Sequence, residues 1–104
     1  MPHLTVRGVS EEELRVLAPK LKQDIVDGSG AKPEHVKVFH SPVKRVDDVD
    51  EVAMDIYWIS RAQEVSDKVA ANLTKTMKDA GKGFVQVTFT EFLPSRFYED
   101  GSHF

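Results

Sequence analysis

The stretch Leu4-Thr5-Val6-Arg7-Gly8-Val9-Ser10-Glu11-Glu12-Glu13 decides the fold, because it joins a short strand to the start of a helix. Residues 4–6 are partly β-branched and alternate in polarity, which is typical of a strand. Residues 10–13 form a capping box, in which the Ser hydroxyl and the Glu carboxylate bind exposed backbone N–H groups at a helix start. One apolar stripe then follows at helical spacing: Leu14, Leu17, Leu21 and Ile25.

This first helix ends before a second strand. Pro19 lacks a backbone N–H and predicts a kink in the middle of the helix. Gly28 and Gly30 predict its end, and residues 36–39 resume an extended pattern. The first half of the chain therefore predicts a β-α-β unit.

The second half repeats this order about 50 residues later. Residues 56–59 are aromatic and β-branched and predict a strand, and residues 60–63 (Ser60-Arg61-Ala62-Gln63) resemble a second capping box. Gly81 and Gly83 close the helix, and residues 85–89 predict the last long strand. The stripe of the second helix consists of Val65, Val69, Leu73 and Met77. The pattern indicates a duplicated β-α-β unit, although chance similarity of two segments is the alternative.

The predicted fold class is α+β, with two β-α-β repeats in one four-stranded sheet and both helices on one face, because crossover connections are right-handed. The chain is expected to be a single domain over residues 1–104, with repeat one at about 2–41, a linker at about 42–52 and repeat two at about 53–104. A short strand is expected within the linker at residues 43–46, before an acidic run.

Composition limits the possible functions. The 104 residues carry a net charge of −3 and no cysteine, which excludes a disulfide scaffold, a thiolate metal site and cysteine catalysis. The four histidines are scattered, so a metal site is not expected. No apolar run is long enough for a membrane span, and the first residues lack the features of a secretory signal. The simplest expectation is a cytoplasmic protein without a membrane partner.

Apolar residues on both faces of the sheet point to an oligomer. Val36, Val38, Val85 and Val87 are expected on one side of their strands. Burial elsewhere is expected for Phe39, Trp58 and Phe84. Because an apolar sheet face must be covered, we expect the open face to meet another subunit. A monomer with a few exposed aromatic side chains is the alternative.

Residues 82–89 partly fit an RNA-binding pattern, K-G-F-G/A-F-V-x-F. Gln86 occupies the central position that should carry a base-stacking aromatic residue, and the segment follows the second helix instead of preceding it. The acidic net charge also argues against a nucleic-acid partner.

Pro2 is the most informative single residue. Methionine aminopeptidase usually removes Met ahead of a small second residue, so the mature chain is expected to begin with a free prolyl amine. In an apolar pocket, desolvation lowers the pKa of such an amine and makes it a general base near neutrality. The alternative is an ordinary exposed N-terminus whose proline merely starts a strand.

Pro2 before a strand, the duplicated β-α-β units and the chain length together resemble the tautomerase superfamily, which includes macrophage migration inhibitory factor and 4-oxalocrotonate tautomerase. Met1-Pro2-His3 resembles the start of the 5-carboxymethyl-2-hydroxymuconate isomerase branch. Residues 30–33 (Gly30-Ala31-Lys32-Pro33) resemble a segment of migration inhibitory factor that carries a pocket lysine. The whole chain most resembles an uncharacterised bacterial branch.

The resemblance implies a homotrimer with a pocket at each subunit boundary. It implies keto–enol tautomerisation of a small α-keto or enol acid, with Pro2 as the catalytic base and no cofactor. The residues it implies for binding the carboxylate substrate or lining the pocket are Lys32, Lys37, Gln86, Arg96 and Phe97. The sequence departs from the oxalocrotonate enzyme at its two arginine positions, which here hold Val9 and Lys37. Two alternatives stay open: a non-catalytic oligomeric module of the same fold and an RNA-recognition-like domain.

Overall fold

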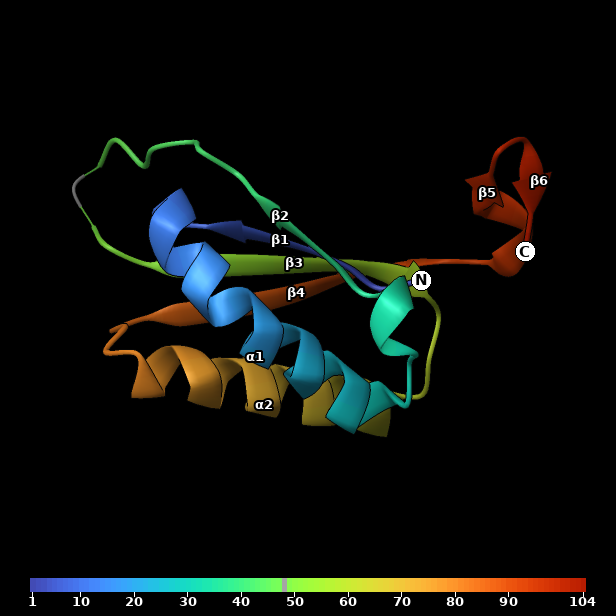
Figure 1. Ribbon diagram of the computed structural model, residues 1–104, viewed down its shortest axis with the longest axis horizontal. Helices are drawn as coiled ribbons and strands as arrows, with labels where there is room; N and C mark the ends of the chain where they lie inside the picture. Colours follow the sequence, from blue (N-terminus) through green and yellow to red (C-terminus); the bar gives the residue numbers. More distant parts are fainter. Residues whose placement is uncertain (48) are drawn as a thin grey trace.

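The protein is a four-stranded sheet that carries two long helices on one face (Figure 1). The computed structural model describes residues 1–47 and 49–104. The main elements are β1 (His3–Arg7), α1 (Glu11–Ser29), β2 (Lys37–His40), β3 (Val52–Ile59), α2 (Gln63–Asp79) and β4 (Val85–Phe92). The shorter elements are the 3-10 turns η1 (Pro33–His35) and η2 (Pro94–Arg96) and the strands β5 (Tyr98–Glu99) and β6 (Ser102–His103).

The two β-α-β units lie side by side in one sheet. Its strand order is β2-β1-β3-β4, with β1 parallel to β2 and β3 parallel to β4. The two units meet where β1 and β3 pair antiparallel. One row of partners crosses the whole sheet and contains Lys37, His3, Tyr57 and Thr90. The predicted fold class is therefore confirmed.

Both ends of α1 follow the sequence signals. The Ser10 hydroxyl accepts a hydrogen bond from the Glu13 N–H at 3.1 Å, which confirms the first half of the predicted capping box. The Glu13 carboxylate instead binds the Lys82 ammonium at 2.7 Å. At the other end Gly30 has a φ of 73°, and its N–H donates to the Val26 carbonyl at 2.9 Å. Such a left-handed residue closes a helix, and glycine adopts it without a steric penalty. The helix continues through Pro19 without interruption.

The second predicted capping box is wrong. Helix α2 begins at Gln63 with Ala62 as its N-cap, and no side chain caps it. Ser60 instead continues the sheet, because its N–H donates to the Phe92 carbonyl at 3.0 Å. Ser60 therefore extends the pairing between β3 and β4 and does not cap α2.

The strand predicted at residues 43–46 is also wrong, since these residues form no strand. Arg45 lies among acidic neighbours here, in a bidentate pair with Asp47 and 3.2 Å from Glu51. Asp48 lies outside the described residues. The strand β3 then starts at Val52, four residues before the predicted strand.

The core lies between the helices and the sheet. Trp58 is completely buried there, and its predicted burial elsewhere is wrong. Because successive strand residues face opposite sides, Trp58 shares a face with Ile56 and Met54, both of which are fully buried under the helices. The other members of this core include Leu4, Val6, Leu21, Ile25, Val69, Leu73 and Met77.

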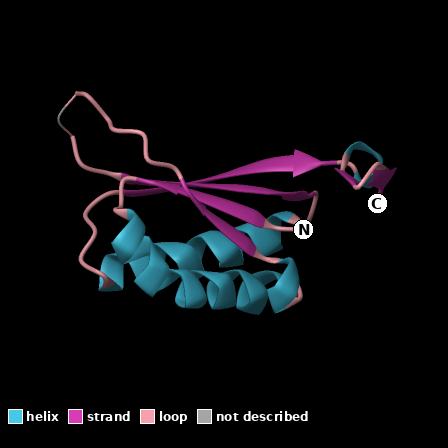
Figure 2. Cartoon of the chain, turned by 45° about the horizontal axis from the view of Figure 1, so that its top comes forward, coloured by secondary structure: helices cyan, strands magenta, loops and turns pink. Residues whose placement is uncertain are grey.

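The opposite face of the sheet is open (Figure 2). Phe39 and Tyr57 lie on it with exposed fractions of 48% and 39%. The C-terminal hairpin of β5 and β6 does not cover this face and lies beyond the end of the sheet (Figure 2). Among the described residues, no helix has both the length and the apolar character that crossing a membrane requires.

Candidate functional site

Pro2 is buried directly before β1, which is one of the two inner strands of the sheet. Its carbonyl accepts a hydrogen bond from the Lys37 N–H at 3.1 Å, which ties the start of the chain to β2. The N-terminus therefore occupies a fixed place at one end of the sheet, close to η1 (Figure 1). A proline nitrogen held in this way has little freedom to move away from a bound molecule.

Arg61 lies beside this terminus. Because β1 and β3 are antiparallel, the end of β3 adjoins the start of β1. The guanidinium carbon of Arg61 lies 5.1 Å from the centroid of the Trp58 ring, within cation–π distance. Its Nη1 donates to the Ser29 carbonyl at 3.2 Å. Its Nε is buried and has no hydrogen-bond partner among the described residues.

Glu91 holds the surroundings of Arg61 in place. Its Oε2 accepts the indole N–H of Trp58 at 3.1 Å and the backbone N–H of Arg61 at 3.2 Å. One carboxylate thus fixes both the aromatic ring under the guanidinium and the backbone that carries it. This arrangement orients the cation toward the N-terminal end of the sheet.

The local charges favour a neutral amine at the chain start. Burial lowers the pKa of the Met1 amine, the Arg61 charge lowers it further, and Glu99 on β5 opposes the shift. Desolvation and a nearby positive charge both penalise an ammonium ion. A neutral amine beside a guanidinium can take a proton from a bound acid while the cation holds negative charge.

His3 and Phe97 form an aromatic wall next to Pro2. The His3 ring lies edge-on to Phe39 at 5.7 Å and to Phe97 at 5.9 Å between centroids. Phe97 also contacts Phe92 at 6.0 Å and Phe104 at 5.3 Å. Because β4 runs antiparallel to β1, it ends where β1 begins, and the tail that follows β4 places Phe97 at the same end of the sheet as Pro2.

All three predicted cationic side chains are exposed. Lys37 pairs with His3 across β1 and β2, and its N–H binds the Pro2 carbonyl. Lys32 precedes η1, which lies close to the chain start in Figure 1. Arg96 ends η2, one residue before Phe97. All three belong to segments at the end of the sheet that holds Pro2.

Gln86 lies apart from the others. It pairs with Ala53, whereas His3 lies in the row of Tyr57 and Thr90, four residues further along β4. At the rise of a strand this separation is about 13 Å. One chain therefore does not bring Gln86 to Pro2.

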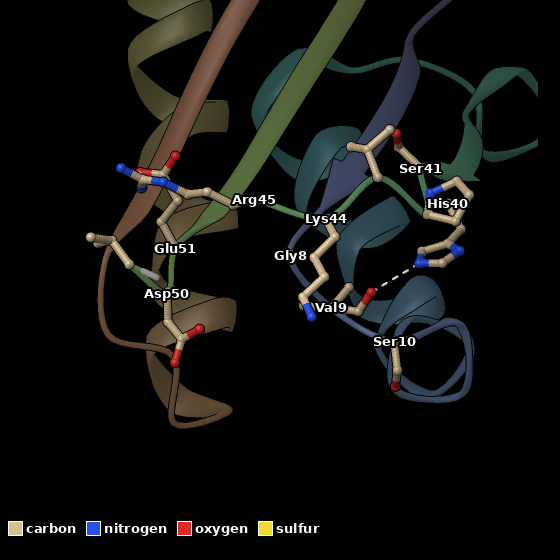
Figure 3. A pocket seen from close by; sticks show the side chains of 12 residues that line it. Gly8, Val9, Ser10, His40, Ser41, Lys44, Arg45, Asp50 and Glu51 are labelled. Atoms are coloured by element: carbon tan, nitrogen blue, oxygen red, sulfur yellow. Dashed lines mark hydrogen bonds and ion pairs between the residues drawn. The ribbon is translucent and has the colours of Figure 1, made fainter. Parts of the chain in front are cut away.

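A separate hollow lies at the far end of the sheet, between residues 8–10 and residues 40–45 (Figure 3). In it His40 Nε2 lies 2.9 Å from the Val9 carbonyl, and Arg45 is paired with acidic neighbours. The His40 ring and the Arg45 guanidinium in this hollow are thus already paired within the chain. The described residues also bring together no cluster of three His, Asp or Glu side chains that could hold a metal ion.

The sequence analysis missed His3, Arg61 and Glu99 as members of this site. Arg61 was assigned to a helix cap, although its place directly after the strand of the second repeat was a usable signal. When the first strands of the two repeats pair antiparallel, the end of the second one lies next to the start of the first one, which is the start of the chain. Glu99 carried no comparable signal, because its proximity depends on the path of the C-terminal tail. His3 follows Pro2 directly, but the sequence did not show which residues would surround its ring.

A family described as "Domain of unknown function (DUF1904)" matches residues 1–103. The chain is similar to a crystal structure of that domain from Sebaldella termitidis ATCC 33386, with 26% identity, a TM-score of 0.88 and coverage of 100% of both chains. No curated protein matches the sequence.

Two further solved structures share the fold. A fused 4-OT, described as an asymmetric trimer, has 19% identity and a TM-score of 0.82 over 97% of this chain and 94% of its own. A macrophage migration inhibitory factor-like protein from Entamoeba histolytica has 20% identity and a TM-score of 0.78 over 99% of this chain and 98% of its own. The fold is therefore that of the tautomerase superfamily, as the resemblance implied.

Proposed function

The chain belongs to the DUF1904 family, and from this premise we propose that it is a tautomerase-like enzyme that moves a proton between carbon and oxygen of a small 2-oxo acid. The prolyl amine exposed by removal of Met1 is the general base. Arg61 binds the substrate carboxylate, with Lys37 and Lys32 adding positive charge at the entrance. No cofactor is needed for such a proton transfer.

The observation that carries this proposal is the Arg61 guanidinium beside the buried chain start. Its Nε is buried without a partner among the described residues, and an unsatisfied buried donor of this kind is costly unless a ligand completes it. A carboxylate accepts two N–H bonds from a guanidinium. The same charge lowers the pKa of the Met1 amine, and in the proposal it acts likewise on the prolyl amine one residue further on, so that one side chain supports both binding and basicity.

The site is proposed to be completed in a homotrimer. The fused 4-OT that shares the fold is described as a trimer, and the open sheet face and the projecting hairpin of this chain leave surfaces for neighbours. Gln86 is remote from Pro2 within one chain, so its proposed role in binding requires a neighbouring subunit. Phe97 serves within its own chain as a wall that excludes water.

The test is turnover of the enol form of phenylpyruvate by protein whose loss of Met1 has been verified by mass spectrometry. Pro2→Ala should abolish most of the activity while leaving the melting temperature and the assembly unchanged. A control variant, Pro42→Ala in the exposed linker, should retain full activity. Equal and measurable rates for Pro2→Ala and the parent protein would exclude Pro2 as the base, and absence of turnover by the parent protein would favour the non-catalytic oligomeric module.

A further inference from the structure

His3 belongs to the N-terminal site, but the proposed mechanism does not use its polar group. Its Nε2 is buried and has no hydrogen-bond partner among residues 1–47 and 49–104. A buried ring nitrogen without a partner loses its bond to water and gains nothing in return. Such a nitrogen in a native protein calls for an explanation, and a bound ligand is one.

The surroundings of His3 fix the direction of its ring. Phe39 on β2 and Phe97 in the tail hold it edge-on from two sides, at 5.7 and 5.9 Å. The backbone of His3 is paired with both Lys37 and Tyr57, so the ring is anchored at its base as well. A ring held in this way is a positioned hydrogen-bonding group.

The charge state of His3 suits the same purpose. Burial lowers its pKa, and the Lys37 ammonium and the N-terminal amine lower it further, against the opposing effect of Glu99. These groups come from β2, the chain start and β5, respectively. A histidine with a pKa below its ordinary value of about 6.5 is neutral at pH 7. A neutral imidazole donates a hydrogen bond without adding a charge that would compete with Arg61 for the carboxylate.

We infer that His3 is a further catalytic residue, whose Nε2–H donates a hydrogen bond to the C2 oxygen of the substrate. This inference rests on the proposed function. The Arg61 guanidinium binds the carboxylate at C1, the prolyl amine serves C3, and His3 covers the oxygen between them. A donor at this oxygen stabilises the negative charge that develops there when the proton leaves carbon. The site would thereby select acids that carry an oxygen at C2.

The test uses His3→Phe, which keeps an aromatic ring between Phe39 and Phe97 but removes the nitrogen. With the enol form of phenylpyruvate, kcat should fall by about 100- to 1,000-fold. His3→Gln places an amide donor in the same direction and should recover part of the loss. The melting temperature and the assembly of His3→Phe should match those of the parent protein.

A binding measurement separates this role from a structural one. His3→Phe should weaken the binding of phenylpyruvate but leave unchanged the binding of 3-phenylpropanoate, which has the carboxylate and no oxygen at C2. Equal weakening of both acids, or an unchanged kcat, would overturn the inference.

The two proposals also fail separately. If Pro2→Ala lowers turnover and His3→Phe does not, the proposed function stands and the role of His3 is wrong. If Pro2→Ala has no effect on turnover, the proposed function is wrong. The role of His3 is then tested only by the binding of phenylpyruvate and 3-phenylpropanoate. Equal affinities of the parent protein and His3→Phe for phenylpyruvate would then overturn its role as well.

Discussion

The guanidinium carbon of Arg61 lies 5.1 Å from the centroid of the Trp58 ring, and both residues bind the same carboxylate oxygen of Glu91. Trp58 is fully buried in the core, so the position of the cation is tied to the most rigid part of the molecule. The packing of the core therefore fixes the position of the Arg61 charge beside the chain start.

Arg61→Ala should raise the KM for 2-oxo acids by about 10- to 100-fold, because a hydrogen bond to a charged group contributes about 1.5–3 kcal/mol. Arg61→Lys should recover only part of the loss, since an ammonium lacks the planar fork of a guanidinium. Steady-state kinetics on the phenylpyruvate enol measures both effects. The control is Arg15→Ala, which removes a surface arginine paired with Glu11. A KM unchanged in Arg61→Ala would remove Arg61 from the site.

Lys37→Ala should raise the KM for acidic substrates more than Lys32→Ala does, because Lys37 pairs with His3 next to the chain start. Both side chains are exposed, so each effect should stay within about fivefold, as solvent screens surface charges. Raising the salt concentration should reduce the difference in KM between each variant and the parent protein. If neither variant changes KM, both lysines are solvated surface residues.

The architecture itself was largely predictable from the sequence, because its signals are local. The spacing of apolar residues and the Ser10 cap depend on neighbours along the chain, and both are confirmed. The errors arose where a distant segment decides the outcome. Ser60 pairs with Phe92, 32 residues away, and so does not cap α2. The site was predicted only in part for the same reason, since Arg61 and Glu99 reach the chain start through tertiary packing, and so do the aromatic residues that surround the His3 ring.

Gly28→Ala should destabilise the protein by about 1 to 2 kcal/mol, because overpacking outweighs the better helix propensity of alanine. A Cβ at Gly28 would lie 2.7 Å from Val69 Cγ2 and 3.1 Å from the Val69 nitrogen, where α1 and α2 make close contact. Urea denaturation gives the free energy of unfolding. Gly83→Ala is the matched control, since its Cβ would meet nothing within 4 Å. Equal stability of the two variants would contradict the close packing.

Stability should fall as the pH is lowered from 7 to 5, and His3 should account for part of this loss. Its pKa is lower in the folded protein, so the unfolded chain binds the proton more readily below the ordinary histidine pKa. The loss begins near that ordinary pKa and is complete below the pKa of folded His3. His3→Phe should therefore lose less stability over this range than the parent protein in urea titrations. The exposed His35→Gln serves as control; the same pH dependence in all three proteins would exclude His3.

Sedimentation equilibrium should give about three times the monomer mass of 11.7 kDa. Phe39→Glu places a charge on the open sheet face and should dissociate the assembly, because burying an unpaired carboxylate is costly. Val16→Glu changes a residue that is 80% exposed on α1 and should leave the assembly intact. A parent protein that sediments as a monomer at micromolar concentration would contradict the shared-site proposal.

The central claim is that the prolyl amine of the mature chain is a general base. A ¹⁵N NMR titration of protein labelled with ¹⁵N-proline, after mass spectrometry has verified the loss of Met1, measures the pKa of this amine directly. Burial and the Arg61 charge act on the chain start in the same direction, so the account predicts a pKa clearly below that of a free secondary amine. Arg61→Ala should raise this pKa toward the free value. An amine that titrates as an unperturbed secondary amine would contradict the account.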